Sequence, residues 1–176
     1  EAQPEFDRPY RDNPVTFVVV GLGMGKTRVH QLTETCGTRL YGVCDVNLKK
    51  ARAIGEQYGV PYSDDINVFL SDPAVEVMYV VTPTGTHCEV AMQCLRAGKH
   101  VLTTKPMDVS TPACDAAIAL AREKGLLLGV DFDERHRMRY LEQKATVDSG
   151  FFGRILSYNV NLYIRRPQSY YDEDGG

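Results

Sequence analysis

The feature of this 176-residue sequence that most constrains its fold is a short apolar run that ends in a series of glycines. Residues Thr16 to Val20 are β-branched or aromatic, which is typical of a strand buried on both faces of a parallel sheet. Gly21, Gly23 and Gly25 follow this run, and a helix is expected over roughly Met24 to Thr35. A phosphate approaches the amides of a helix N-terminus only where no side chain intervenes. The turn, including Met24, therefore predicts a binding site for a dinucleotide pyrophosphate.

The spacing of these glycines leaves two interpretations open. The motif is G-x-G-x-G, and Lys26 stands where a third small residue is usual in the G-x-G-x-x-G form. Either the loop holds a pyrophosphate, or it is a tight strand-to-helix turn that binds nothing. The residues that follow favour the first interpretation.

An acidic residue ends the second expected strand, which runs from Arg39 to Asp45. Asp45 lies 20 residues after the last of the three glycines, where a carboxylate accepts hydrogen bonds from the adenosine ribose. This favours NAD over NADP, because the 2′-phosphate of NADP would meet a negative charge. Asp45 also has the alternative role of capping a helix from Leu48. NADP remains possible, because three cations follow closely: Lys49, Lys50 and Arg52.

Strands and helices continue to alternate over the first 130 residues. Further strands are expected at Val75–Val81, His100–Thr103 and Leu126–Val130. Helices are expected over Leu48–Tyr58, from a Thr86-x-x-Glu89 capping box to Gly98, and from an N-cap at Thr111 with Pro112 at the first position. Parallel neighbours need a crossover, so this order predicts an α/β fold, a Rossmann-type doubly wound parallel sheet.

The pattern changes after about residue 130. Residues Arg154 to Ile164 alternate apolar and polar side chains, which predicts a strand of an antiparallel sheet with one wet face. A lone strand cannot satisfy its hydrogen bonds, so we interpret it as the start of an α+β substrate domain with a mostly antiparallel sheet. The expected organisation is an irregular arm over 1–14, a Rossmann domain over 15–135, and a linker helix with the first strand of a truncated domain over 136–176.

Composition and charge exclude several classes of partner. The net charge of −3 and the pI near 5.8 argue against nucleic acid and anionic membranes. The five cysteines form no C-x-x-C pair and the four histidines lack ligand spacing, so no metal site is expected. No apolar run approaches the roughly 20 residues that cross a bilayer. A small-molecule partner and a cytoplasmic location are the default expectations, although the chain opens on Glu1 and a leader could have been removed.

Four motifs, in this order, resemble the glucose-fructose oxidoreductase / inositol dehydrogenase (Gfo/Idh/MocA) family. They are Gly21-Leu-Gly-Met-Gly, Cys44-Asp45-Val-Asn, Val81-Thr-Pro-Thr-Gly-Thr-His87 and Ala97-Gly-Lys-His-Val-Leu-Thr-Thr-Lys105-Pro106. The resemblance covers residues 15 to about 175 and implies the N-terminal part of a family member. The segment Phe152-Gly-Arg-Ile-Leu-Ser resembles the family's entry into the substrate domain.

The resemblance implies a set of site residues. Lys105 corresponds to the active-site lysine, near the nicotinamide and the substrate hydroxyl, and Arg135 corresponds to a residue near the groove. The cofactor-groove residues carried over are Thr82, Pro83, Thr84, His87, Thr104, Lys105 and Pro106. Two of them depart from the family: Thr84 replaces the usual Asn, and Thr104 replaces the usual Glu, so Lys105 lacks an anionic neighbour. By its position alone, His87 is equally a solvated or capping side chain at the first turn of a helix.

The resemblance also implies an activity. In the family, NAD(P) takes a hydride from a secondary alcohol carbon of a sugar, polyol or related compound while a base removes the hydroxyl proton. Lys105 would bind or polarise the substrate oxygen, and the proton-transferring Asp and His of the family belong to the second domain. This chain is then the cofactor-binding half of an enzyme that forms a homo-oligomer. Two alternatives stay open: a dinucleotide-binding regulatory protein without turnover, and an NAD-dependent glycosidase.

Overall fold

The computed structural model of the protein describes residues 13–169. The chain divides into two compact units, Glu1–Val130 and Asp131–Gly176. The irregular arm expected over residues 1–14 lies almost wholly outside the described residues.

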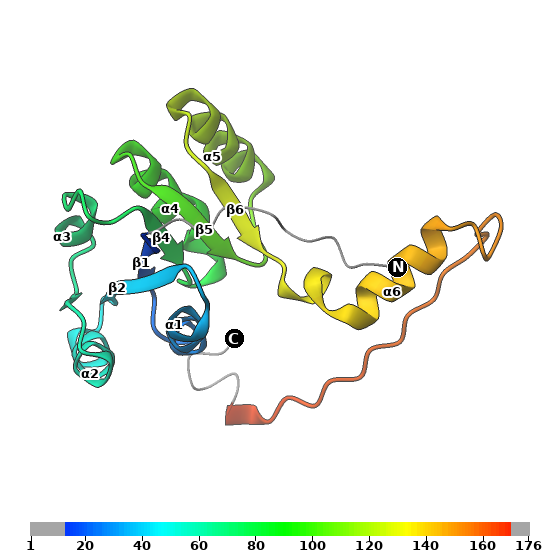
Figure 1. The fold of residues 1–176 in the computed structure, drawn as a ribbon, viewed down its shortest axis with the longest axis horizontal. Coiled ribbons are helices and arrows are strands. Elements are labelled where there is room, and N and C mark those ends of the chain that lie inside the picture. The colour runs from blue at the N-terminus through cyan, green and yellow to red at the C-terminus, as the bar shows by residue number, and fades with distance from the viewer. Residues whose placement is uncertain (1–12, 170–176) are drawn as a thin grey trace. The chain divides into compact units, whose positions relative to one another are not determined.

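The strands form one six-stranded sheet in the order β3-β2-β1-β4-β5-β6 (Figure 1). Strand β1 pairs in parallel with both β2 and β4, while β2 pairs in parallel with β3 and β4 with β5. This arrangement confirms the predicted Rossmann-type, doubly wound sheet. The strands are β1 Val15–Val20, β2 Thr38–Cys44, β3 Tyr62–Ser63, β4 Val77–Val80, β5 His100–Thr104 and β6 Leu128–Asp131.

Helices cover both faces of the sheet (Figure 1). The helices on one face are α1 Gly25–Glu34 and α2 Leu48–Tyr58, and those on the other are α3 Asn67–Leu70, α4 His87–Arg96 and α5 Thr111–Lys124. The helices predicted from the sequence are confirmed with small shifts at their ends. The short β3 and α3 were not predicted, because two and four residues carry too little periodicity to be recognised.

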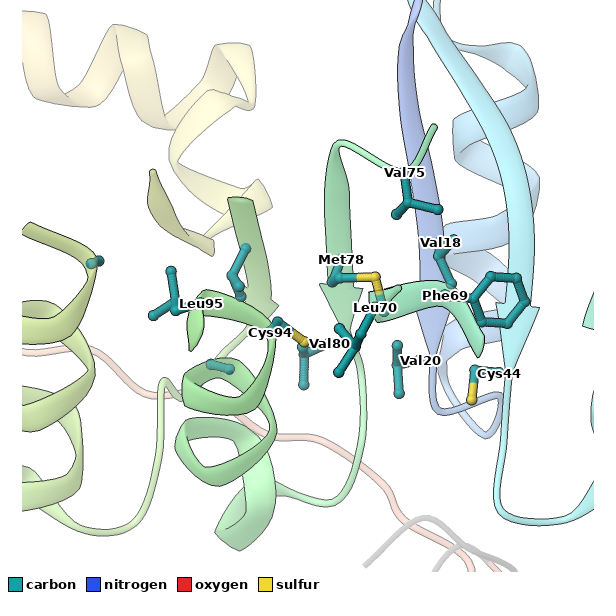
Figure 2. Packing of buried hydrophobic residues seen from close by; sticks show 13 residues of the cluster. Val18, Val20, Cys44, Phe69, Leu70, Val75, Met78, Val80, Cys94 and Leu95 are labelled. Atoms are coloured by element: carbon teal, nitrogen blue, oxygen red, sulfur yellow. The ribbon is translucent and has the colours of Figure 1, made fainter. Parts of the chain in front are cut away.

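Consecutive residues of β1 divide the core into two clusters. Val18 and Val20 pack with Leu95 of α4 in one cluster, which Figure 2 shows from close by. Val19 packs with Val29 of α1 in the other. Successive side chains of a strand point to opposite faces, so an unbroken apolar run is what a strand covered on both faces requires.

Two predictions about helix caps, those for Thr86 and Thr111, are wrong, and the alternative role of Asp45 as a cap is not observed. Asn47, not Asp45, caps α2, because its Oδ1 accepts bonds from two first-turn amides at 3.1 and 3.3 Å. Ser110, not Thr111, caps α5, with its Oγ 3.4 Å from the amide nitrogen three residues on. Thr86 precedes α4 but makes no capping bond. Both observed caps have extended backbones and Thr86 does not, which is the geometry that a side-chain cap requires.

The second unit contains a 3₁₀ turn, Asp133–His136, and helix α6, Met138–Asp148. The helix predicted up to Ser149 is therefore confirmed. The predicted strand over Arg154–Ile164 is not formed: residues 155–167 have no regular secondary structure. A strand exists only as part of a ladder, and within the described residues this segment meets no neighbouring strand.

Candidate nucleotide-binding site

The predicted site residues of the first unit gather where the parallel strands end. Two backbone bonds join these ends: the amide of Gly21 donates to the carbonyl of Cys44 at 2.8 Å, and that of Val81 donates to Val20 at 2.7 Å. Strand β1 lies between β2 and β4, and the chain leaves β1 toward one face and β4 toward the other. Ligands of open α/β sheets bind in the crevice at this point.

The three glycines of the loop are required for three different reasons. Gly21 has a φ of +90°, and a Cβ there would lie 2.6 Å from the carbonyl oxygen of Val81. A Cβ on Gly25 would lie 3.3 Å from Cγ1 of Val19, so this glycine lets α1 pack against β1. A Cβ on Gly23 would meet no atom within 4 Å. Packing explains the first two, and open space at Gly23 is what a bound pyrophosphate would need.

The N-terminus of α1 has the electrostatic character of an anion site. Helix α1 begins after Met24 without a side-chain cap, and its first turn contains no acidic residue. Lys26 lies exposed in that turn, although a cation near a helix N-terminus opposes the helix dipole. An anion bound to the loop amides offsets both effects. In this spacing, which departs from G-x-G-x-x-G, Gly25 takes the packing role of the third glycine.

Asp45 joins the glycine loop to the end of β2. Its Oδ2 accepts a bond from the Leu22 amide at 2.7 Å, and its Oδ1 accepts one from the Asn47 amide at 2.8 Å. These bonds fix the half-buried carboxylate beside the loop, and each oxygen keeps a lone pair for another donor. Arg52 is one of the three cations after Asp45 that could favour NADP. It forms an ion pair with Glu56, in which its Nε lies 2.7 Å from Oε1 of the glutamate. This partner also raises the pKa of Arg52.

The segment after β4 turns tightly before α4 begins. The Thr86 hydroxyl lies 2.9 Å from Oγ1 of Thr82 and 2.7 Å from the carbonyl oxygen of Pro83, so it faces back into its own turn. Thr84 opens a single 3₁₀ turn, Thr84–Thr86. Thr82 and Thr84 are half-buried, whereas Pro83 is exposed.

The buried His87 differs from its expected place in the groove. Its side chain is 1% exposed, and its Nε2 lies 2.6 Å from the carbonyl oxygen of Thr82. Its Nδ1 lies 2.9 Å from the carbonyl oxygen of Pro106. Both ring nitrogens therefore face backbone of the two neighbouring loops and leave no polar atom for a ligand.

The loop after β5 carries Lys105. Thr104 ends the strand half-buried, and Lys105 and Pro106 are exposed and joined by a cis peptide bond. Asp108 then turns back toward α4, where its Oδ2 accepts a bond from the Cys88 amide at 3.0 Å. This bond is the largest cause of the lowered pKa of the Asp108 carboxyl group, and hydrogen bonds from two amides of its own loop lower the pKa further.

Asp108 therefore caps α4 from a distant loop, whereas the sequence predicts that Thr86 caps this helix. Sequence reasoning missed it, because a cap from 20 residues away has no local signature. Arg135 belongs to the second unit, where its guanidinium lies 5.0 Å from the centre of the Phe132 ring. Its predicted place near the groove stays a prediction.

The cysteines, histidines and acidic residues that the structure describes are the candidate ligands of a metal centre. Among the described residues, no group of three or more His, Cys, Asp or Glu side chains is placed to hold an ion. Burial raises the pKa of the thiols of Cys44, Cys88 and Cys94 to about 12, so these thiols are protonated at neutral pH. Within the described part of the chain, every helix is too short or too polar to cross a membrane.

Several known proteins are similar to this chain in sequence or in fold. Inositol 2-dehydrogenase of Salmonella typhimurium is 28% identical over 166 residues, covering 88% of this chain and 49% of its own length. The scyllo-inositol 2-dehydrogenase (NAD(+)) of Bacillus subtilis is 29% identical over 150 residues, and the match covers 84% of this chain and 44% of the relative. The structure of a 3-ketoreductase from Actinomadura kijaniata, solved with NADP, superposes with a TM-score of 0.74 at 29% identity. The match covers 80% of this chain and 46% of the ketoreductase.

The chain thus spans about half the length of the relatives it matches. The family model described as "Oxidoreductase family, NAD-binding Rossmann fold" matches residues 15–132, which include the glycine loop, Asp45, the turn after β4 and Lys105. The protein therefore belongs to the GFO_IDH_MocA oxidoreductase family, the Gfo/Idh/MocA group whose motifs its sequence resembles.

Proposed function

We propose that this chain is the cofactor-binding half of an oxidoreductase that transfers a hydride between NAD(P) and a secondary alcohol carbon of a sugar or polyol. The single observation that carries the proposal is the open space at Gly23, beside an uncapped helix N-terminus and a fixed carboxylate. A turn that binds nothing has no need of a glycine at that position. The relatives that are named as inositol 2-dehydrogenases, and one that is named as a reductase of a dTDP-linked didehydro-dideoxy-glucose, supply the substrate class.

The residues of the chain divide the work of binding. The glycine loop and the N-terminus of α1 would hold the pyrophosphate, and Asp45 would accept hydrogen bonds from the ribose. We propose NAD as the preferred cofactor, because Asp45 repels a 2′-phosphate and Arg52 is already paired with Glu56. When bound, the nicotinamide accepts or returns the hydride.

Lys105 is the residue of this chain that we place closest to the reaction. It follows the carboxyl end of β5, the edge at which parallel sheets bind ligands. An exposed ammonium there would bind the substrate oxygen and stabilise negative charge that develops on it when the proton leaves. Thr82, Pro83, Thr84, Thr104 and Pro106 would line the groove around it, and Arg135 is a further cofactor-binding residue that we propose from the family resemblance.

The finer properties of the whole protein are also proposals. We propose a cytoplasmic protein, which the free cysteines support because none of the five forms a disulfide. We propose that the second unit begins a substrate domain with a mostly antiparallel sheet, and that copies of the protein assemble through it. The exposed apolar side chains of the second unit, among them Phe151, Leu156 and Leu162, support a covering partner.

The test is turnover by the intact protein with NAD and NADP over a panel of inositols, sugars and sugar ketones. We expect reduction of NAD with at least one alcohol, and we expect Lys105→Met to abolish turnover while NAD still binds. Lys124→Met, which removes an exposed lysine from the last turn of α5, is the matched control and should leave turnover unchanged. A wild type that binds NAD and oxidises nothing would favour the regulatory alternative. Cofactor that copurifies and is not consumed during glycoside cleavage would favour the glycosidase.

A further inference from the structure

Cys88, in the first turn of α4, contacts the loop that carries Lys105. Its amide donates a hydrogen bond to Oδ2 of Asp108 at 3.0 Å. Its Sγ lies 3.7 Å from the carbonyl oxygen of Met107, an acceptor to which the thiol donates. Cys88 thus connects the helix to this loop through both its backbone and its side chain.

A second thiol lies beside that of Cys88. Cys114, near the start of α5, has its Sγ 3.9 Å from Sγ of Cys88. Helices α4 and α5 pack against each other, and Ala91 of α4 and Ala121 of α5 belong to the same core cluster. The two sulfurs are therefore brought together by the packing of two helices.

A disulfide bond between these sulfurs requires only a small movement. The length of an S–S bond is about 2.05 Å, so the two sulfurs must approach by about 1.9 Å from their present separation of 3.9 Å. Rotation about the Cα–Cβ bond of a cysteine moves its sulfur over a distance of this order. The pair can therefore be joined while the helices keep their packing.

The two thiols differ in their access to solvent. Cys88 is 1% exposed, whereas Cys114 is partly exposed. Burial is the largest cause that raises the pKa of the Cys88 thiol to about 12, and its hydrogen bond to Cys114 is the next. Because the thiolate is the reactive form of cysteine, the accessible Cys114 is the thiol that a dissolved oxidant meets first.

We propose that Cys88 and Cys114 are a redox modification site, at which hydrogen peroxide produces a disulfide that joins α4 to α5 and alters the Lys105 loop. The sulfur of Cys114 attacks the O–O bond, which gives a sulfenic acid and one water. The sulfur of Cys88 then attacks the sulfenic sulfur, and its proton leaves with the hydroxyl group as a second water. The two thiols lose two electrons, and the peroxide gains them.

The disulfide changes the support of the loop without touching the side chain of Lys105. A disulfide sulfur carries no proton, so the carbonyl oxygen of Met107 loses its donor. The bond also closes the segment from Cys88 to Cys114, which contains β5 and the whole Lys105 loop. An effect on turnover rests on the proposed function, whereas formation of the disulfide does not.

The chemical test is peptide mapping of the intact protein after treatment with hydrogen peroxide and alkylation of the remaining thiols. We expect a peptide in which Cys88 is joined to Cys114, a loss of two thiols per chain, and recovery of both with dithiothreitol. Cys114→Ser should form no such peptide. Cys36→Ser, which removes an exposed cysteine, is the matched control and should form it as the wild type does.

Two results of the mapping would overturn the inference whatever the protein catalyses. One is oxidation of Cys114 alone, to a sulfinic acid, while Cys88 remains a thiol. The other is a disulfide through Cys36 between two copies of the chain in place of the expected bond.

The functional test is the turnover of the oxidised protein after the peroxide has been removed. We expect kcat of the wild type to fall about tenfold, because a displaced loop misplaces Lys105, and to recover with dithiothreitol. Cys114→Ser treated in the same way should keep its kcat, whereas oxidation of Met107 would affect both proteins alike. An unchanged kcat in cross-linked wild type would overturn the effect on the Lys105 loop. If the untreated wild type turns over no substrate, the proposed function fails, while the peptide map still decides whether the disulfide forms.

Discussion

The glycine loop after β1 and the Lys105 loop after β5 lie at the same edge of the sheet but are held in opposite ways. The glycine loop is shaped by missing side chains, and the carboxylate of Asp45, which directly follows β2, accepts a hydrogen bond from its Leu22 amide. The Lys105 loop is held by side chains and amides of α4, with partners 19 and 20 residues apart in sequence. The glycine loop therefore depends on backbone space, and the Lys105 loop depends on buried polar contacts.

The largest expected effect on stability is that of Gly21→Ala. The new Cβ would lie 2.6 Å from a backbone oxygen and would force an alanine to adopt a φ of +90°. We expect the free energy of unfolding to fall by about 3 kcal/mol from strain and overpacking together. Urea unfolding followed by circular dichroism measures this, and an unchanged midpoint would contradict the role assigned to Gly21.

Gly23→Ala sharpens the comparison, because it changes binding without strain. No atom lies within 4 Å of the new Cβ, so the unfolding midpoint should match that of the wild type. The methyl group occupies the space for the pyrophosphate, and we expect NAD affinity to fall at least about tenfold, or about 1.4 kcal/mol. Calorimetric titration with NAD checks this. Unaltered affinity would mean that the pyrophosphate does not approach Gly23.

Asp45→Asn tests the charge of the site separately from its geometry. The amide oxygen of Asn still accepts the bond from Leu22, so the link to the glycine loop is kept, whereas the amide nitrogen cannot accept the bond that the Asn47 amide donates to Asp45. Without the negative charge, the preference for NAD over NADP should decrease about tenfold, equivalent to about 1.4 kcal/mol. Paired titrations with the two cofactors give the ratio. A ratio equal to that of the wild type would remove Asp45 from the ribose site.

The same contrast explains which parts of the molecule were predictable from sequence. The run ending in Gly21 and the helix after it are encoded by consecutive residues, so periodicity and glycine positions were enough. The cap on α4 comes from Asp108 and the partners of His87 come from two separate loops, and such contacts leave no mark on local sequence. The family resemblance identifies His87 as a candidate site residue, but nothing in the local sequence predicts that its side chain is buried.

Asp108→Ala tests the connection on the Lys105 side. Loss of the cap on α4 should lower the free energy of unfolding by about 1 kcal/mol at pH 7. The pKa of Asp108 is lowered in the folded state, chiefly by the Cys88 amide, so its contribution is complete above the unfolded value near 4. The contribution disappears as the pH falls through the folded pKa.

The measurement is the difference in unfolding free energy between wild type and Asp108→Ala at several pH values. The difference should be constant between pH 7 and pH 5 and should shrink below about pH 4. A difference that grows in acid would show that Asp108 is not bound as a carboxylate. The connection between the loop and α4 would then rest on His87 and Cys88 alone.

The smallest expected effect comes from the caps of α5, which follows the Lys105 loop. The Ser110 oxygen lies 3.4 Å from its amide partner, a long bond, so Ser110→Ala should cost only about 0.5 kcal/mol. Thr111→Ala should be neutral or slightly stabilising, because Thr111 is the first helical residue and alanine has the higher helix propensity. Urea unfolding of the two variants side by side distinguishes them. A larger loss of unfolding free energy in Thr111→Ala than in Ser110→Ala would show that Thr111 is the cap, as the sequence predicts. Ser110 would then be an ordinary turn residue of the Lys105 loop.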